Sequence, residues 1–321
     1  MVARLRAEFY VNTLTWAILA TRCKIIVKLL MRMRNSKRAT QPIRARYLLA
    51  TMLMTLIAVL SLTRPASAQE RKLIQASVGS SGNIDVHLYL PEGKGPFPLI
   101  VLSHGSSQDP RIRLLQGPNT MRIQAMDFVA RGFVAAVPIR RGYGPTATTS
   151  WAEDFEDCST SAYRRAAMAT AEDIRASVKA VLAEPAVDRS RIVLLGFSAG
   201  GWGSLAAASL DTIPGLKAVV NFAGGRGSKG PNIICGGDNA LINAVPHFAG
   251  SKIPQLWIYA RNDLFFGADL ATRMHSAFTK AGGKAAMILA PAIGTDGHGY
   301  LFTSTDWRDA VHGFLRSNGA Q

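Results

Sequence analysis

The chain has 321 residues, of which 48% are hydrophobic, and it carries a formal net charge of +16. This length and hydrophobic share allow a large buried core and exclude a mostly disordered protein. The charge does not indicate a nucleic-acid-binding protein, because residues 1–68 hold 12 of the 37 Lys and Arg residues but only one of the 21 acidic residues, and no dense basic run follows.

The end of this basic segment has the pattern of a secretory signal peptide. A basic stretch, 31–46, precedes an apolar stretch, 47–62, and a short Ala-Ser-Ala sequence that ends at Ala68. Small residues at the last and third-last positions are typical of a signal-peptidase site. We therefore predict cleavage after Ala68 and an exported mature chain, periplasmic or extracellular, that starts at Gln69. A membrane anchor is the alternative, but the apolar stretch is shorter than the ~20 residues that a spanning helix needs.

Residues 1–30 precede this pattern, and a signal peptide rarely has so long a segment before its basic part. We expect translation to start at Met31 or Met33. The alternative is a membrane-associated segment at 9–30, but three basic residues interrupt its apolar run. We expect no stable membrane span in the mature chain.

The three cysteines, Cys23, Cys158 and Cys235, fit this interpretation. Removal of the leader leaves Cys158 and Cys235, and an even pair in an oxidising compartment can close a disulfide. Two unpaired buried thiols are the alternative, and the sequence leaves it open.

Strands and helices are predicted to alternate along the mature chain. An antiparallel hairpin, 73–78 with 84–90, comes first. Further strands are predicted at 99–103, 133–138, 191–196, 216–222, 255–260 and 285–290, and helices at about 120–131, 160–183, 268–281 and 305–317, with one more directly after residue 198. Residues 223–250 are rich in Gly, Pro and Asn and are predicted to form a loop. This order indicates an α/β fold with a mostly parallel central sheet, helices on both faces and an antiparallel N-terminal hairpin. One catalytic domain, 69–321, is the economical interpretation.

Gly196-Phe197-Ser198-Ala199-Gly200 matches the G-x-S-x-G pattern between a predicted buried strand and a helix. This is the context of a nucleophile elbow, a sharp turn that exposes a serine hydroxyl next to a helix N-terminus. A simple glycine-rich turn is the alternative. Ser198 is therefore the candidate nucleophile.

A serine hydroxyl needs a histidine base, and in the elbow-type chain order that base follows the nucleophile. The histidines after Ser198 are His247, His275, His298 and His312. We favour His298, which lies in a glycine-rich loop after the last predicted strand. His275 and His312 fall inside predicted helices, where His312 is interpreted as a surface residue, and His247 precedes the candidate acid.

A carboxylate must orient the base. Asp263 follows the strand at 255–260, and a carboxylate at the carboxyl end of a parallel strand faces the site. Asp269 is predicted to lie in the next helix, Asp296 is too close to His298 in the chain to reach its far ring nitrogen easily, and Asp238 lies in the irregular loop. We therefore predict Asp263 as the acid.

The sequence Ser-His-Gly-Ser ends the strand at 99–103. In this fold type the loop after that strand and the residue after the nucleophile each supply an N–H to the oxyanion hole, so the amides of Ser106 and Ala199 are the candidates. His104 precedes the nucleophile and is interpreted as a structural residue of this loop.

The motifs LIVLSHGS, GFSAGGWGS, YARND and DGHGY occur in that order between about 84 and 317. With these motifs the chain resembles the dienelactone hydrolase-like and prolyl-oligopeptidase-like branch of the α/β-hydrolases. The resemblance implies an α/β-hydrolase fold and a Ser-His-Asp hydrolase. True dienelactone hydrolases have a cysteine nucleophile where this chain has Ser198, which favours ester or related acyl hydrolysis over lactone hydrolysis.

The loop at 138–145 should lie at the same sheet edge as Ser198. Its Tyr143 and Arg141, together with Trp202, are predicted to contact substrate, and ordinary packing and surface charge are the alternative. No spacing of metal ligands and no phosphate-binding glycine loop is present, so no metal or cofactor is expected.

These features predict an exported serine esterase that cleaves a small acyl ester through an acyl-enzyme intermediate, with no nucleic-acid partner. A peptidase or an acyltransferase with the same residues is one alternative. A non-catalytic exported binding protein of the same fold is the other. The sequence does not predict an oligomeric state.

Overall fold

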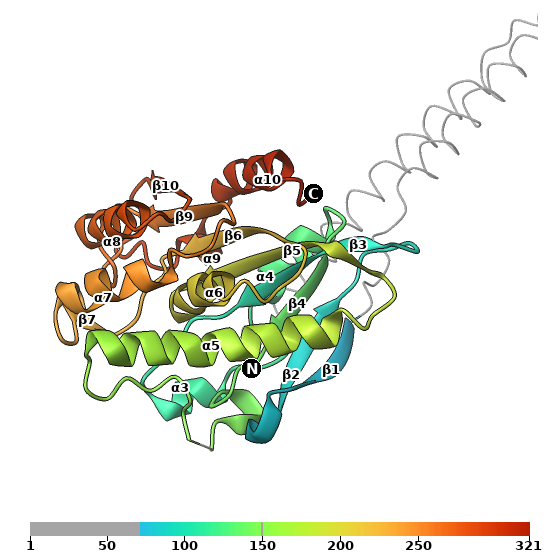
Figure 1. Cartoon of the computed structure of the whole chain (residues 1–321), viewed down its shortest axis with the longest axis horizontal. Coiled ribbons are helices and arrows are strands. Elements are labelled where there is room, and N and C mark those ends of the chain that lie inside the picture. Colours follow the sequence, from blue (N-terminus) through green and yellow to red (C-terminus); the bar gives the residue numbers. More distant parts are fainter. Residues whose placement is uncertain (1–70, 149) are drawn as a thin grey trace, which may run out of the picture. The chain divides into compact units, whose positions relative to one another are not determined.

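The computed structural model of the chain describes residues 71–148 and 150–321 (Figure 1). The predicted signal peptide, its cleavage site, the start at Met31 or Met33, and Cys23 lie outside these residues. Among the described helices, none is long and apolar enough to cross a membrane.

The described residues form an eight-stranded sheet in the order β1-β2-β4-β3-β5-β6-β9-β10. β2 is antiparallel to both of its neighbours, and every other neighbouring pair is parallel, which confirms the predicted fold class. The strands are β1 (Arg71–Ser77), β2 (Asn83–Tyr89), β3 (Phe97–Ser103), β4 (Val134–Pro138), β5 (Val187–Phe197), β6 (Leu216–Phe222), β9 (Gln255–Ala260) and β10 (Ala285–Ala290).

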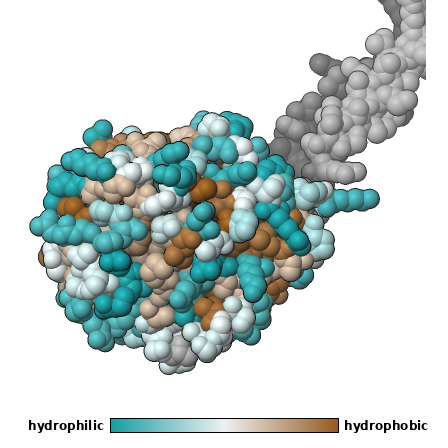
Figure 2. Space-filling model, viewed as in Figure 1, coloured by the Kyte–Doolittle hydropathy of each residue, from teal (hydrophilic) through white to brown (hydrophobic). Residues whose placement is uncertain are grey.

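Helices cover both faces of the sheet. The buried core on one face includes residues of α5, α6, α7 and α8, and the core on the other face includes residues of α4, α9 and α10. α5 and α6 lie in front of the sheet in Figure 1, and this face mixes hydrophilic and hydrophobic residues (Figure 2). The helices are α3 (Pro110–Leu114), α4 (Arg122–Val129), α5 (Thr160–Val181), α6 (Ala199–Ser209), α7 (Asp238–Ala244), α8 (Ala268–Lys280), α9 (Tyr300–Thr303) and α10 (Trp307–Ser317).

The continuous apolar run of β5 explains how one strand serves both layers. Ile192 and Leu194 belong to the first core, whereas Val193 and Leu195 belong to the second. Successive side chains of a strand point to opposite faces, so a central strand with helices on both sides must be apolar at every position. The carboxyl end of β5 is thereby fixed in the middle of the sheet, and Ser198 follows it directly.

The prediction of a loop at 223–250 was wrong in part. This segment contains β7 (Ser228–Gly230), β8 (Ile233–Ile234), α7 and a 3₁₀ turn, Val245–Phe248. Gly and Asn are turn-forming residues, but the apolar side chains of α7 and of the 3₁₀ turn are buried in the core. Their burial stabilises helical structure despite the weak local propensity.

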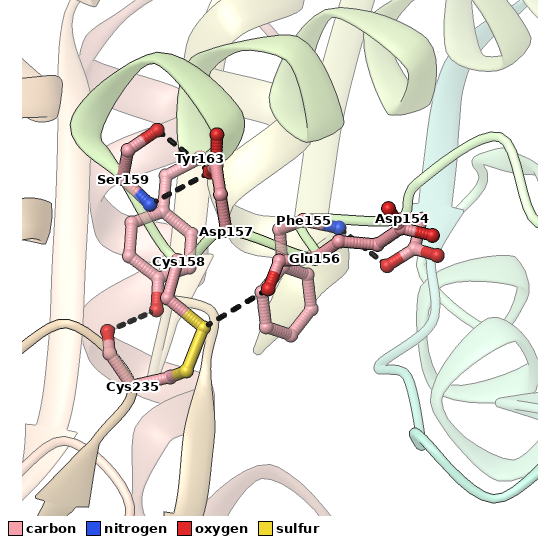
Figure 3. The surroundings of a disulfide bond; sticks show 8 residues. All are labelled: Asp154, Phe155, Glu156, Asp157, Cys158, Ser159, Tyr163 and Cys235. Atoms are coloured by element: carbon pink, nitrogen blue, oxygen red, sulfur yellow. Dashed lines mark hydrogen bonds between the residues drawn. A yellow bond between two sulfur atoms is a disulfide. The ribbon is translucent and has the colours of Figure 1, made fainter.

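Cys158 and Cys235 form the predicted disulfide, which spans 77 residues of sequence (Figure 3). Cys158 lies just before α5 and Cys235 just after β8. The hydroxyl of Tyr163, in the first turns of α5, also donates to the carbonyl oxygen of Cys235, at 2.5 Å. The bridge therefore fixes the β7–β8 hairpin to the start of α5.

Loss of this bridge should destabilise the protein. Because it closes a 77-residue loop, the chain-entropy model assigns it about 4 kcal/mol of unfolding free energy. Urea unfolding with and without dithiothreitol measures this loss, and a Cys158→Ala/Cys235→Ala double variant should match the reduced protein and not respond to dithiothreitol. An unfolding midpoint that dithiothreitol leaves unchanged in the wild-type protein would contradict the assignment.

Candidate active site

Ser198 occupies a strained turn between β5 and α6. Its φ of 54° and ψ of −120° lie in a region that residues with a side chain rarely adopt. The surrounding backbone is very close: a Cβ on Gly196 would lie 2.3 Å from the carbonyl oxygen of Gly200, and one on Gly200 would lie 2.1 Å from that of Ser103. The glycines on both sides of Ser198 are therefore required by the tight packing of β3, β5 and α6, as the G-x-S-x-G pattern predicts.

The structure brings Ser198, His298 and Asp263 together, although they lie far apart in the sequence. His298 Nε2 lies 3.2 Å from Ser198 Oγ, and His298 Nδ1 lies 3.1 Å from each carboxylate oxygen of Asp263. An ionised carboxylate only accepts hydrogen bonds, so it fixes the proton of the neutral ring on Nδ1. Nε2 then presents its lone pair to the serine hydroxyl.

Asp263 is held by the turn in which it lies. Its side chain is fully buried, and its Oδ1 atom accepts backbone N–H groups from Phe265 at 2.7 Å and Phe266 at 2.9 Å. Two N–H donors and the His298 ring therefore surround the carboxylate. These contacts fix its rotamer and direct both oxygen atoms towards the imidazole.

The loops that carry Asp263 and His298 are joined by two polar side chains that sequence reasoning missed. Asn262 donates to the carbonyl oxygens of Ile293 and Gly294 and accepts from the Ile293 N–H. Asp296, considered above as a rival acid, accepts the N–H groups of Leu264 at 3.0 Å and His298 at 2.9 Å. Asp296 therefore positions the backbone of His298 rather than its ring. The sequence gives one indication of these roles: Asn262 directly precedes Asp263, and Asp296 lies two residues before His298.

Aromatic rings enclose the imidazole. Phe265 stacks on the His298 ring with 4.2 Å between centroids and an angle of 18° between planes. The ring centroids of Phe197 and Phe266 lie 5.0 Å and 5.6 Å from the centroid of the His298 ring. This packing limits rotation of the ring and leaves the His298 side chain only 12% exposed.

Ser198 opens into a cavity of about 480 Å³ that Ser106, Phe155, Arg226, Phe265 and Phe266 also line. Gly105 lies directly beside the nucleophile, because a Cβ built on it would be 3.4 Å from Ser198 Cβ. The Ser106 N–H finds no acceptor among the described residues. Ala199 begins α6, so its N–H is one of the groups that a helix start leaves without an intrahelical partner. Ser106 therefore lines the same cavity as Ser198, and Ala199 directly follows Ser198 in the chain.

Comparison with known families now identifies the class of protein. The model of the dienelactone hydrolase family matches residues 112–318, a range that contains Ser198, Asp263 and His298. The chain belongs to the dienelactone hydrolase family. It is therefore a member of a hydrolase family with the α/β-hydrolase fold, as the sequence motifs implied.

Solved structures of α/β-hydrolases share the fold. The uncomplexed acylaminoacyl peptidase of Pyrococcus horikoshii has a TM-score of 0.59 and 16% identity, over 82% of this chain and 43% of the peptidase. An acylaminoacyl peptidase in complex with Z-Gly-Gly-Phe-chloromethyl ketone has a TM-score of 0.58 and 20% identity, over 78% of this chain and 42% of that one. The acetyl xylan esterase of Paenibacillus sp. R4 has a TM-score of 0.54 and 16% identity, over 83% of this chain and 93% of the esterase.

Because the sequence identities to these structures are only 16–20%, the comparison shows a shared fold and nothing more. The chain spans less than half the length of the two peptidases. No curated protein sequence matches it.

The predicted substrate contacts need correction, because Tyr143, Trp202 and Arg141 do not line the Ser198 cavity. Tyr143 and Trp202 are buried at 0% and 1% exposure, where the Trp202 ring N–H donates to the carbonyl oxygen of Tyr163. Arg141 binds Asp173 on α5. The loop at 138–145 follows β4 as expected, but Tyr143 is held inside the protein and Arg141 turns towards α5.

His312 was also wrongly interpreted as a surface residue. It is 3% exposed, its Nε2 atom lies 3.4 Å from an oxygen of Asp127, and its ring lies 5.2 Å from that of Phe128. Asp127 and Phe128 belong to α4, so His312 lies on the face of α10 that packs against α4.

His104 is a buried structural residue of the loop after β3, as expected. Its Nδ1–H donates to the Gly105 carbonyl oxygen at 2.6 Å, and its Nε2 accepts the Arg140 N–H at 3.4 Å. Burial, together with the nearby Arg140 guanidinium, lowers the pKa of His104 to about 3. The ring is therefore neutral in the folded protein at neutral pH.

This neutral ring predicts a loss of stability in acid. Between pH 6.5 and about 3 the unfolded chain binds a proton at His104 that the folded protein excludes. The contribution to stability is complete above pH 6.5 and falls as the pH falls, by about 3 kcal/mol at pH 4. Urea unfolding at pH 7 and pH 4 measures the change, and His104→Asn should reduce it by about that amount. An equal change in wild type and variant contradicts the prediction.

Proposed function

We propose that the chain is an exported serine hydrolase that cleaves carboxylic esters of small acyl groups, with one catalytic domain at 69–321. The observation that carries the proposal is the continuous contact from Ser198 Oγ through the His298 ring to buried Asp263. A serine with this arrangement on an elbow is an activated nucleophile.

The proposed reaction has two acyl transfers. Ser198 Oγ attacks the ester carbonyl carbon while its proton passes to His298 Nε2, and Asp263 stabilises the imidazolium. The N–H groups of Ser106 and Ala199 stabilise the tetrahedral oxyanion. The intermediate collapses, the alcohol leaves with the proton from His298, and an ester between Ser198 and the acyl group remains. Water, deprotonated by His298, repeats the attack on this ester and releases the carboxylic acid and free Ser198.

The size of the cavity and the disulfide support the finer parts of the proposal. A cavity of about 480 Å³ with three phenylalanines among its lining residues suits a compact acyl or alcohol group. A disulfide is typical of proteins that fold in an oxidising compartment, which supports export and agrees with the signal-peptide pattern of residues 31–68.

A substrate panel tests this function on protein that starts at Gln69. The panel contains p-nitrophenyl esters with acyl chains from two to twelve carbons, the matching anilides, and methanol as a competing acceptor. We expect hydrolysis of the short esters, much slower cleavage of the anilides and little transfer to methanol. Anilide cleavage at a comparable rate would indicate a peptidase, dominant transfer to methanol an acyltransferase, and no turnover of any compound a binding protein.

A further inference from the structure

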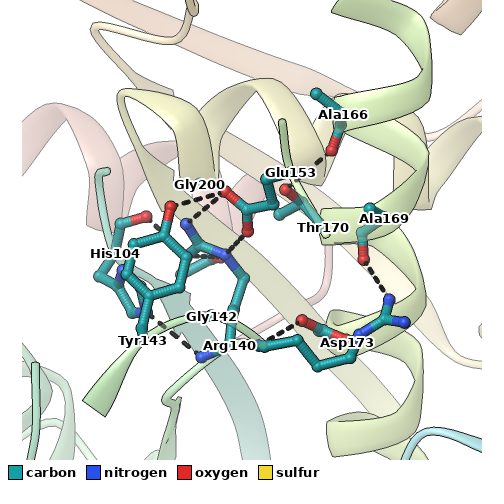
Figure 4. A network of polar contacts seen from close by, with 12 residues as sticks. His104, Arg140, Gly142, Tyr143, Glu153, Ala166, Ala169, Thr170, Asp173 and Gly200 are labelled. Carbon is teal, nitrogen blue, oxygen red and sulfur yellow. Dashed lines mark hydrogen bonds and ion pairs between the residues drawn. The ribbon is translucent and has the colours of Figure 1, made fainter. Parts of the chain in front are cut away.

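A buried arginine lies beneath the loop that carries Ser106. Arg140, just after β4, is fully buried and contacts three successive residues at the end of β3. Its Nη1 atom donates to Ser103 Oγ at 3.1 Å and to the carbonyl oxygen of His104 at 2.7 Å, and its Nη2 atom donates to the carbonyl oxygen of Gly105 at 3.4 Å. Figure 4 shows the Arg140 side chain between His104 and Glu153.

The contacts to Gly105 fix the orientation of the next amide. The carbonyl oxygen of Gly105 accepts from Arg140 and from the His104 ring. The peptide bond between Gly105 and Ser106 is trans, so its N–H points opposite to its carbonyl oxygen. Because the carbonyl is held inward, the Ser106 N–H points away from Arg140, and Ser106 lines the Ser198 cavity.

We propose that Arg140 is a positioning residue for the oxyanion hole, which holds the Gly105–Ser106 peptide so that the Ser106 N–H faces the developing oxyanion. The inference rests on the proposed function, since it needs a tetrahedral intermediate at Ser198. Arg140 itself does not touch substrate, because its side chain is fully buried.

Arg140 is in turn held by a second group of buried residues. The Glu153 carboxylate binds both Arg140 and Arg226 and accepts the Tyr143 hydroxyl at 2.8 Å. Burial alone raises the pKa of Glu153, but the two guanidinium groups outweigh it and hold the pKa below its usual range. Two arginines and one carboxylate leave a net charge of +1, and Arg226 also lines the Ser198 cavity. This excess positive charge favours an oxyanion at the site.

Arg140→Lys tests the proposal, because lysine keeps the charge but cannot form the planar set of hydrogen bonds. Removing one oxyanion donor costs about 10²–10³-fold in kcat, so a misaligned Ser106 amide should lower kcat for a short p-nitrophenyl ester by about 10²-fold, with little change in KM. Affinity for a trifluoromethyl ketone, which forms a tetrahedral oxyanion on serine, should fall in parallel.

Arg141→Lys is the matched control. Arg141 is the next residue and is also ion-paired, but its partners are Asp173 and Glu172 on α5 and not the loop after β3. Its replacement should lower the unfolding midpoint and leave kcat and ketone affinity within about threefold of wild type. Equal losses of kcat in the two variants, or wild-type kcat and ketone affinity in Arg140→Lys, would overturn the proposal.

Two further measurements cover the remaining outcomes. If Arg140→Lys does not fold, Ser103→Ala, which removes one acceptor of Arg140, should still lower kcat and ketone affinity together, and wild-type values there would overturn the proposal. If the wild-type protein hydrolyses nothing, the proposed function fails and the oxyanion role of Arg140 fails with it. The crystal structure of Arg140→Lys then still tests the geometric part of the inference, that Arg140 holds the Gly105–Ser106 peptide. A rotated Gly105–Ser106 peptide supports it, and an unchanged peptide contradicts it.

Discussion

Ser198→Ala should lower kcat for ester hydrolysis by about 10⁴-fold or more. The variant lacks the only atom that can form the acyl-enzyme, so water must attack the bound ester directly, helped by the oxyanion donors alone. KM should change little, because the hydroxyl contributes little to ground-state binding. Initial rates with p-nitrophenyl acetate measure the loss against buffer and enzyme blanks.

The folded state of this variant should remain intact. Alanine has a Cβ like serine and experiences the same strained backbone at φ 54°, so the urea midpoint should match that of wild type. A folded Ser198→Ala protein that keeps most of its esterase activity would show that another residue carries the reaction.

Asp263→Asn should have the second largest effect, a loss in kcat of about 10³–10⁴-fold. An asparagine amide can donate to His298 Nδ1, which stabilises the ring tautomer with its proton on Nε2. That tautomer cannot accept the proton of Ser198, and the variant also lacks the charge that stabilises the imidazolium. The measurement is the rate on the same ester, with thermal unfolding as a check on the fold.

Asp269→Asn is the matched control, since Asp269 is the nearest rival acid in the sequence. Its side chain is 83% exposed and pairs with Arg273 on α8. This variant should keep wild-type kcat. A large loss of kcat in Asp269→Asn, combined with normal activity in Asp263→Asn, would show that Asp263 is not the acid.

The sheet and the candidate triad could be predicted from sequence because their signals are local. The apolar run of β5 predicts a buried strand without reference to any other segment, and the glycines around Ser198 identify the elbow that follows it. Asp263 and His298 follow strands whose carboxyl ends meet at one edge of a parallel sheet. Topology alone therefore places the three residues near one another.

The surroundings of the site could not be predicted because they depend on contacts between distant segments. Tyr143 is buried with its hydroxyl donating to Glu153, and Glu153 is buried in ion pairs with arginines from two separate loops. Nothing in the sequence near Tyr143 shows whether its side chain turns inward or towards substrate. The contacts of Asn262 with residues 293 and 294 likewise exist only after the two loops meet.

The central claim is that His298 and Asp263 activate Ser198, and covalent labelling tests it most directly. Protein that starts at Gln69 is incubated with a fluorophosphonate, and the adduct is located by intact mass and peptide mapping. The account predicts one adduct per chain, on Ser198, that is absent from Ser198→Ala and forms far more slowly in Asp263→Asn. An unlabelled wild-type protein, or an adduct on a different residue, would contradict it.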